Sequence, residues 1–188
     1  MANIRLNQSE LHRLFLDDVG SYAEDISDTG RKPVLLRLKY PFNTDIKAYI
    51  FNCTAPPGGR SIDEYKVQLI LDGQKRGKRG SFDSSDGRTI LIIGYAVPFI
   101  DKKEGLWVLF ELDKHREFAY SANIQVYLRQ LLKALEQDVY VCRKFNKEIL
   151  VISQRKYLVD ALQKRFDIDL QIALERANDG IKGPRFQT

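Results

Sequence analysis

The sequence EYKVQLIL, residues 64–71, decides the fold class, because its side chains alternate along the chain. In an extended conformation, the apolar and aromatic residues from Tyr65 to Leu71 would share one face, and the mostly polar residues from Glu64 to Ile70 would share the other. Such a strand packs one face against a core and turns the other toward water. The stretch therefore predicts a half-buried β-strand.

Six further short segments have the composition of strands, since they are rich in β-branched or aromatic residues and are bounded by turn residues. These segments are 34–40, 46–54, 88–97, 106–112, 139–145 and 148–154. Only Asn146 and Lys147 separate the last two, which is the spacing of a β-hairpin.

Helical spacing of apolar residues appears before and after the strands. The first predicted helix carries Leu11, Phe15 and Val19, with Asn7 or Ser9 as its cap. A second helix is expected to begin near Asn123, and a third to cover 157–166. The segment 171–188 is mostly polar and contains glycine and proline, so it is predicted to be a tail or the start of a linker.

Together these elements predict a β-rich α+β domain over residues 1–170. We expect a curved antiparallel sheet or a partly closed pseudobarrel of about seven strands, with flanking helices.

The composition is that of a globular protein. The chain of 188 residues is 44% hydrophobic and has a net charge of +5, which is unlike a disordered chain. Cys53 and Cys142 lie far apart, and no cysteine–histidine cluster suggests zinc. The N-terminus lacks a signal peptide, and no apolar run approaches the ~20 residues that cross a bilayer. We expect a cytoplasmic protein with no membrane partner.

Two basic segments suggest a polyanionic partner. The stretch GQKRGKRG (73–80) interleaves four cations with three glycines between two predicted strands. Packing does not explain it, because lysine and arginine are rarely buried without partners, whereas glycine lets the backbone approach a phosphate closely. The stretch DKHREFAYSAN (113–123) adds arginine and asparagine, which can read base edges. Against this, a solvated loop explains the first segment, and core aromatic residues explain part of the second.

The predicted roles divide between the two segments. The four cations of 73–80 would hold phosphates, while other cationic and amide residues would contact bases or the nearby backbone. The candidate DNA-binding residues are Arg60, Lys75, Arg76, Lys78, Arg79, Arg88, Lys114, His115, Arg116, Tyr120 and Asn123.

Two alternative functions remain open. Asp45, Glu64 and Lys66 have a spacing acceptable for a magnesium-dependent PD-(D/E)xK nuclease, and alternation puts the last two on one face. However, acid-x-Lys is frequent by chance, no proline–aspartate pair precedes it, and a surface ion pair explains it equally well. The second alternative is an interaction module with an acidic, non-nucleic-acid partner.

Three phrases in fixed order resemble the N-terminal DNA-recognition module of bacterial restriction endonucleases. They are FNCTAPPGGRSIDEYKVQLILDGQKRGKRGSFD (51–83), RTILIIGYA (88–96) and LDKHREFAYSANIQV (112–126), within a resemblance that covers roughly 34–162. The resemblance implies a B3-like pseudobarrel whose loops clamp the major groove of double-stranded DNA. It also implies a separate nuclease domain, often of the HNH type. No HNH-type histidine cluster follows residue 166, so we expect recognition without catalysis or a cofactor in this chain. Whether methylated cytosine belongs to the target stays open.

Overall fold

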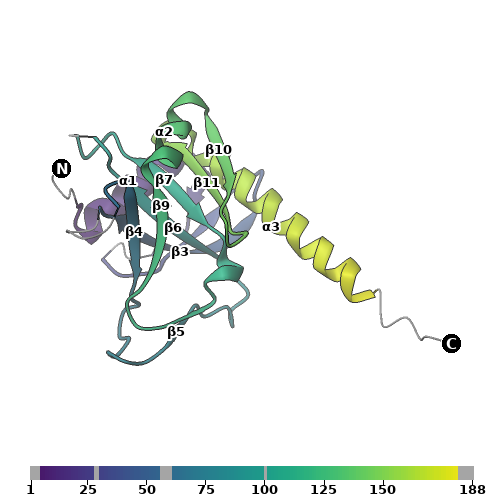
Figure 1. Ribbon diagram of the computed structural model, residues 1–188. Coiled ribbons are helices and arrows are strands. Elements are labelled where there is room, and N and C mark those ends of the chain that lie inside the picture. Colours follow the sequence, from purple (N-terminus) through teal and green to yellow (C-terminus); the bar gives the residue numbers. More distant parts are fainter. Residues whose placement is uncertain (1–4, 28–29, 56–60, 100, 182–188) are drawn as a thin grey trace.

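The computed structural model describes residues 5–27, 30–55, 61–99 and 101–181 (Figure 1). Its centre is a seven-stranded sheet in the order β1-β2-β3-β6-β7-β11-β10. These strands are β1 (Ala23–Glu24), β2 (Val34–Leu38), β3 (Thr44–Cys53), β6 (Thr89–Ala96), β7 (Leu106–Phe110), β11 (Ile149–Gln154) and β10 (Val139–Arg143). Strands β3 and β6 run parallel, and the other neighbouring strands run antiparallel.

Two smaller strand pairs lie outside this sheet. Strands β4 (Glu64–Leu69) and β9 (Ala122–Tyr127) form an antiparallel ribbon, which we call the β4–β9 ribbon. A bridge between Thr54 and Lys66 joins this ribbon to the end of β3. The second pair consists of β5 (Gly80–Ser81) and β8 (Glu117–Phe118).

Three α-helices complete the architecture, and their bounds are α1 (Gln8–Val19), α2 (Leu128–Glu136) and α3 (Leu158–Ile181). Short 3₁₀ turns occupy Gly20–Tyr22 (η1), Leu112–Lys114 (η2) and Arg155–Tyr157 (η3). The start of α1 is fixed by Asn7, whose side chain accepts a hydrogen bond from the Glu10 backbone N–H at 2.9 Å. Within the described residues, no helix has both the length and the apolar composition that crossing a bilayer requires.

The sheet separates two hydrophobic cores. On one face, α1 and α3 pack on residues such as Trp107 and Ile93. On the other face, the β4–β9 ribbon and α2 pack on residues such as Ile92 and Val108. The neighbours Ile92 and Ile93 therefore serve different cores, as the alternation of a strand requires.

Gly94 in β6 is enclosed by side chains of the neighbouring strands and of the ribbon. A Cβ atom at this position would lie 2.4 Å from Cys53 Sγ and 3.1 Å from Val67 Cγ2. Strand β3 and the ribbon therefore enclose residue 94 so closely that it has no room for a side chain.

The α+β class and all seven predicted strand segments are confirmed. The predicted antiparallel sheet needs correction, because β3 and β6 pair in parallel and residues 64–69 leave the sheet for the ribbon. The sheet is not closed into a barrel, since β1 and β10 stand at its two edges. The predicted pseudobarrel is therefore not seen in the described residues.

Two helix predictions also need correction. The helix expected near Asn123 begins at Leu128, because residues 122–127 form β9 with Ile124 and Val126 in the core. The helix expected over 157–166 continues to Ile181 and extends away from the body of the molecule (Figure 1). Part of the predicted tail is thus helical. That residues from 171 onward start a linker stays a prediction, because a helix can also connect two domains.

Candidate nucleic-acid interface

Residues 73–80, which we call the basic loop, follow two tight turns rather than an irregular path. The turns span 71–74 and 75–78, and each is closed by a backbone hydrogen bond of 3.0 Å from its fourth residue to its first. Gly73 and Gly77 occupy the third position of these turns, with φ values of 79° and 78°. Positive φ at the third position favours glycine, so the spacing of these two glycines is explained by the turns.

The side chain of Gln74 braces the basic loop from inside. Its carbonyl oxygen accepts a hydrogen bond from Leu71 N–H at 3.1 Å, and its amide nitrogen donates to the Lys78 carbonyl at 3.0 Å. The backbone that carries the cations is therefore held at both turns.

The four cations of the basic loop point into solvent. All are exposed, and none forms an ion pair with another described residue. They are Lys75, Arg76, Lys78 and Arg79. Exposed cations without acidic partners are available to phosphates.

The acidic residues that follow the basic loop are occupied by other cations. Lys47, a nearly buried lysine of β3, contacts Asp83 at 3.2 Å and Asp86 at 3.0 Å. Asp86 also pairs with Arg88 at 2.6 Å. Hydrogen bonds from Ser85 and Lys47 lower the pKa of Asp83 to about 2. These two carboxylates are thus paired within their own cluster and leave the loop cations unpaired.

The pairing of β5 with β8 brings the two basic segments of the sequence together. Gly80 pairs with Phe118, Ser81 pairs with Glu117, and Phe82 N–H donates to the Arg116 carbonyl at 3.2 Å. In Figure 1 this pair lies at the bottom of the molecule, at the opposite end from α2. We use "basic surface" for the basic loop together with Lys114 and Arg116, which are also exposed.

The other predicted DNA-binding residues differ in availability. Arg116 pairs with Asp113 at 2.7 Å, and Asp113 also contacts Arg176 of α3. Tyr120 is half-buried, and Asn123 is exposed on β9. Arg60 lies outside the described residues.

The outer side of the β4–β9 ribbon, which we call the polar face, extends from the basic surface toward α2. Tyr65, Val67 and Val126 point into the core, so the alternate residues point outward. The alternate residues form three cross-strand pairs, Glu64–Tyr127, Lys66–Gln125 and Gln68–Asn123, of which Glu64 is itself buried. This arrangement confirms the alternation predicted for residues 64–69.

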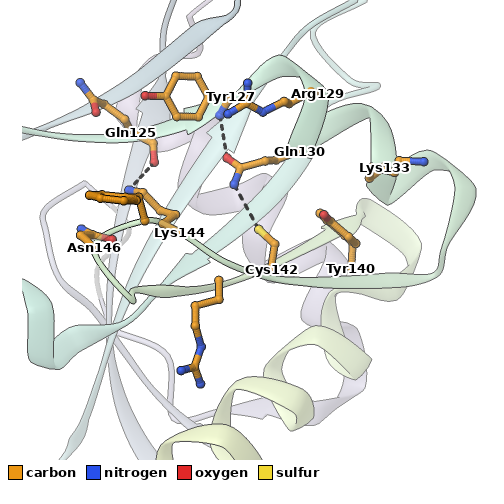
Figure 2. A pocket seen from close by; sticks show the side chains of 11 residues that line it. Gln125, Tyr127, Arg129, Gln130, Lys133, Tyr140, Cys142, Lys144 and Asn146 are labelled. Carbon is orange, nitrogen blue, oxygen red and sulfur yellow. Dashed lines mark hydrogen bonds between the residues drawn. The ribbon is translucent and has the colours of Figure 1, made fainter.

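A pocket lies at the α2 end of the polar face, between β9, α2 and the β10–β11 hairpin (Figure 2). Its volume is about 630 Å³. Four of its lining side chains are cationic and none is acidic; the cations are Arg129, Lys133, Arg143 and Lys144.

None of these four cations was predicted from the sequence as a site residue. Arg129 and Lys133 are one helical turn apart, and Arg143 and Lys144 lie next to the predicted hairpin turn. In the sequence, each pair is therefore typical of ordinary solvent-exposed cations. Only the packing of α2 beside β10 brings the two pairs to one pocket.

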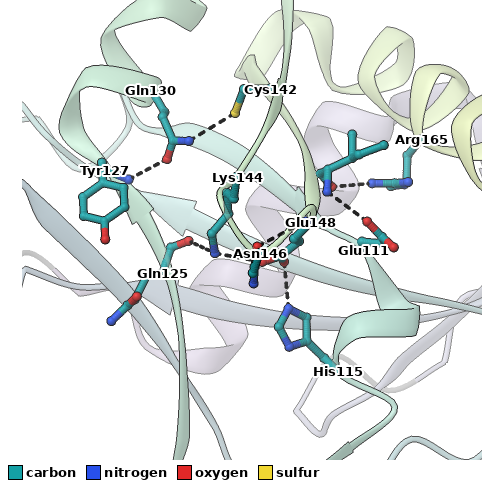
Figure 3. Close-up of polar contacts among 11 residues, drawn as sticks. Glu111, His115, Gln125, Tyr127, Gln130, Cys142, Lys144, Asn146, Glu148 and Arg165 are labelled. Atoms are coloured by element: carbon teal, nitrogen blue, oxygen red, sulfur yellow. Dashed lines mark hydrogen bonds and ion pairs between the residues drawn. The ribbon is translucent and has the colours of Figure 1, made fainter.

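A buried network ties the pocket to the segment before β8 (Figure 3). Glu148, which has no exposed surface, binds His115 Nε2 at 2.7 Å and Lys144 Nζ at 2.8 Å. Lys144 Nζ also donates to the Gln125 carbonyl at 3.0 Å. Burial opposes ionisation of Glu148, but the hydrogen bonds from His115 and Lys144 keep its pKa below the usual value.

This network shows where His115 lies, while its predicted role in DNA binding stays a prediction. Its side chain is mostly buried, Nε2 is taken by Glu148, and the ring packs edge-on against Phe110. In this position His115 holds the segment that carries Lys114 and Arg116.

The magnesium-dependent nuclease alternative does not fit the fold. Lys66 pairs with Thr54 at the far end of β3 from Asp45, so strand geometry separates Asp45 from the Glu64 region by about 30 Å. Carboxylates that share Mg²⁺ bind it at about 2 Å. Instead, Asp45 pairs with Arg37 at 3.4 Å, and Glu64 accepts a hydrogen bond from Gln125 at 3.0 Å. The described residues contain no group of three or more histidine, cysteine or acidic side chains suited to a metal.

Comparison with known proteins gives one family. The family model described as methylase-associated X1 matches residues 44–162, which is more than half of the chain. No curated protein and no solved structure matches the chain. The matched range begins with β3 and ends inside α3, so it contains the basic surface, the polar face and the pocket.

Proposed function

The chain belongs to the methylase-associated X1 family, and from this premise we propose that it is a sequence-specific module for binding double-stranded DNA. The family places it in the context of restriction and modification. The observation that carries the proposal is the β5–β8 pairing, because it joins two cationic segments that are far apart in sequence into one basic surface.

Under this proposal, the two parts of the surface have different tasks. The four cations of the basic loop and Lys114 bind phosphates, which sets position but not sequence. Arg116, Arg88 and Asn123 contact base edges or the nearby backbone, since guanidinium and amide groups can read guanine and adenine. Arg116 and Arg88 would exchange their present carboxylate partners, Asp113 and Asp86, for DNA.

The module would direct the enzyme of a restriction-modification system, most simply a nuclease domain, to its target in the cytoplasm. Binding of this kind requires no cofactor, since phosphates and base edges are recognised by side chains and backbone N–H groups.

The salt dependence of binding tests the proposal. For a duplex held through phosphates, the logarithm of the association constant falls with the logarithm of salt concentration, with a slope of about −0.9 per neutralised phosphate. Replacing Lys75, Arg76, Lys78 and Arg79 with alanine should flatten this slope by about 0.9 for each phosphate that the variant no longer neutralises. Titration of a labelled duplex at several salt concentrations measures both slopes.

A matched control removes the same charge elsewhere. Arg13, Lys39, Lys156 and Lys164 are also exposed, and they lie on or beside α1, α3 and the β2–β3 turn. Their combined replacement by alanine should leave the slope close to that of the wild type. Equal slopes for the two quadruple variants would contradict the proposed surface, as would binding without salt dependence.

Specificity is tested by selection from a randomised duplex pool, with methylated and unmodified pools side by side. A sequence-reading module should enrich a defined motif. Asn123→Ala should then relax one position of that motif, at a cost of about 1–3 kcal/mol for a good bidentate contact. Enrichment of no motif from either pool would contradict sequence-specific binding.

A further inference from the structure

We propose that the pocket between β9, α2 and the β10–β11 hairpin binds one unpaired nucleotide of the DNA strand, an inference that rests on the proposed function for the source of the nucleotide. The volume of about 630 Å³ is within the range of pockets that bind small organic groups. Figure 2 shows that its walls come from three separate elements, and Gln130 of α2 reaches Cys142 of β10, to which it donates a hydrogen bond of 3.3 Å.

The charge of the lining selects an anion. Of its four cations, Lys133 pairs with Glu136 at 2.7 Å and Lys144 with the buried Glu148 at 2.8 Å. Arg129 and Arg143 form no ion pair with another described residue. Arg143 alternates with Cys142 along β10 and so points to the other face of the hairpin. The Arg129 guanidinium is therefore the group available to a phosphate, which an arginine can bind in a bidentate manner.

The aromatic side chains indicate that the anion carries a planar group. Phe145, at the tip of the hairpin, is fully exposed, with a relative accessibility of 106%, so packing within this chain does not account for it. Tyr127 and Tyr140 also line the pocket, and the Arg129 guanidinium lies 4.9 Å from the centre of the Tyr127 ring. Aromatic rings beside cations are the features that bind unstacked nucleotides, because every base has a π-face. Inorganic phosphate would gain nothing from these rings.

Two amide side chains offer hydrogen bonds to a base edge. The Asn146 carbonyl oxygen accepts from Glu148 N–H at 3.1 Å, which leaves its amide N–H groups for a ligand. The Gln125 amide nitrogen donates to Glu64 at 3.0 Å, which leaves its carbonyl oxygen. In Figure 2, Gln125, Lys144 and Asn146 gather on the same side of the pocket.

The position of the pocket connects it with the basic surface. The six residues of β9 span about 20 Å, and the phosphates of one DNA strand are about 3.4 Å apart along the helix axis. One strand held at the basic surface can therefore follow the polar face and reach the pocket about six nucleotides away. Extrusion of a nucleotide from a duplex costs least where the base is already unpaired.

The test compares three labelled probes at low salt: a fully paired duplex, the same duplex with one unpaired nucleotide, and a single strand. Phe145→Ala and Arg129→Ala should each weaken binding of the single strand or the unpaired duplex at least about fivefold, the lower end of what base stacking contributes. Binding of the fully paired duplex should change little. The matched controls are Tyr40→Ala and Arg13→Ala, which alter exposed residues elsewhere.

The outcomes separate this inference from the proposed function. Weakening confined to the single strand supports a nucleotide site that takes single-stranded DNA; weakening that includes the unpaired duplex supports one that takes an extruded nucleotide. If neither variant differs from its control with any probe, or if all three probes weaken equally, the nucleotide site is overturned. Failure of the wild type to bind the paired duplex would overturn the proposed function, while the single-strand probe would still test the pocket. Thermal melting of both variants confirms that they fold, as expected for exposed side chains.

Discussion

Glu148 is the residue on which the candidate interface depends most. It is a fully buried carboxylate, and its two oxygens bind His115 and Lys144, which come from separate segments of the chain. A buried charge is tolerated only when partners compensate for it. The contact with His115 fixes the segment before β8, and the contact with Lys144 fixes the β10–β11 turn beside the pocket.

Glu148→Gln should lower the free energy of unfolding by about 3 kcal/mol, because it leaves the mostly buried ammonium group of Lys144 without its carboxylate partner. The matched control is Glu136→Gln, which breaks the exposed pair with Lys133 and should cost about 0.5 kcal/mol or less. Urea denaturation of both variants measures the difference. Equal stability losses would show that the network contributes no more than a surface ion pair.

Glu148 also shows which part of the site could not be predicted from the sequence. Residue types alone predict that residues 73–80 and 113–123 are cationic. The contact between His115 and Glu148 could not be predicted in this way, because the two residues are 33 positions apart in the chain and no local pattern marks them as neighbours. From residue types alone, a histidine beside arginine and lysine predicts a contact with DNA; the structure adds that its side chain is mostly buried against Glu148.

At the scale of elements, the packing of β3, β7 and the β4–β9 ribbon around Gly94 of β6 leaves no room for a side chain. Gly94→Ala should destabilise the protein by about 1–3 kcal/mol, the range for an added methyl group in a packed core. The double variant Gly94→Ala/Cys53→Ala should lose less than the sum of the single variants, because Cys53 Sγ is the nearest obstacle, at 2.4 Å from the new Cβ. Thermal or urea unfolding of the three variants gives the coupling. If the stability losses of the two single variants simply add, removing the Cys53 thiol does not relieve the crowding at residue 94, and the ribbon must shift to make room.

The elements themselves were largely predictable, but their partners were not. All seven strand segments follow from composition and turn residues. Strand β9 was missed because residues 122–127 continue directly into α2, and the leucines of the helix dominated the interpretation of the segment before it. The parallel pairing of β3 with β6 and the departure of β4 from the sheet depend on contacts between distant segments, which periodicity within one segment does not encode.

At the scale of the whole molecule, several acidic groups bind cations and so couple stability to pH. The pKa values of Asp83, Asp86, Asp113 and Glu148 are all below their usual values, with Asp83 at about 2. A folded-state pKa below the unfolded one gives stability that is present above the unfolded pKa and is lost as pH falls through the folded pKa. Burial raises the pKa of Asp169, which acts in the opposite direction.

We therefore expect the melting temperature to fall as the pH is lowered from about 4.5 to 2, since the lowered groups outnumber Asp169. Calorimetry or circular dichroism across this range measures the decline. Asp83→Asn should reduce the part of the decline nearest pH 2, because the pKa of the Asp83 carboxyl in the folded protein is about 2. A melting temperature that rises on acidification would contradict the assignment of these pairs.

The parallel pairing of β3 and β6 has a consequence for how the protein folds and how it tolerates change. Two parallel neighbours cannot be joined by a tight turn, so the chain makes a long excursion between them, and that excursion contains β4, the basic loop and β5. The central hydrogen bonds of the sheet form only when this excursion closes, which slows folding relative to a sheet of hairpins. The entropy of closure grows only with the logarithm of length. Insertions or deletions in the exposed turns of the excursion, outside β4, therefore carry little thermodynamic penalty, and the cationic surface can be reshaped while the sheet beneath it stays the same.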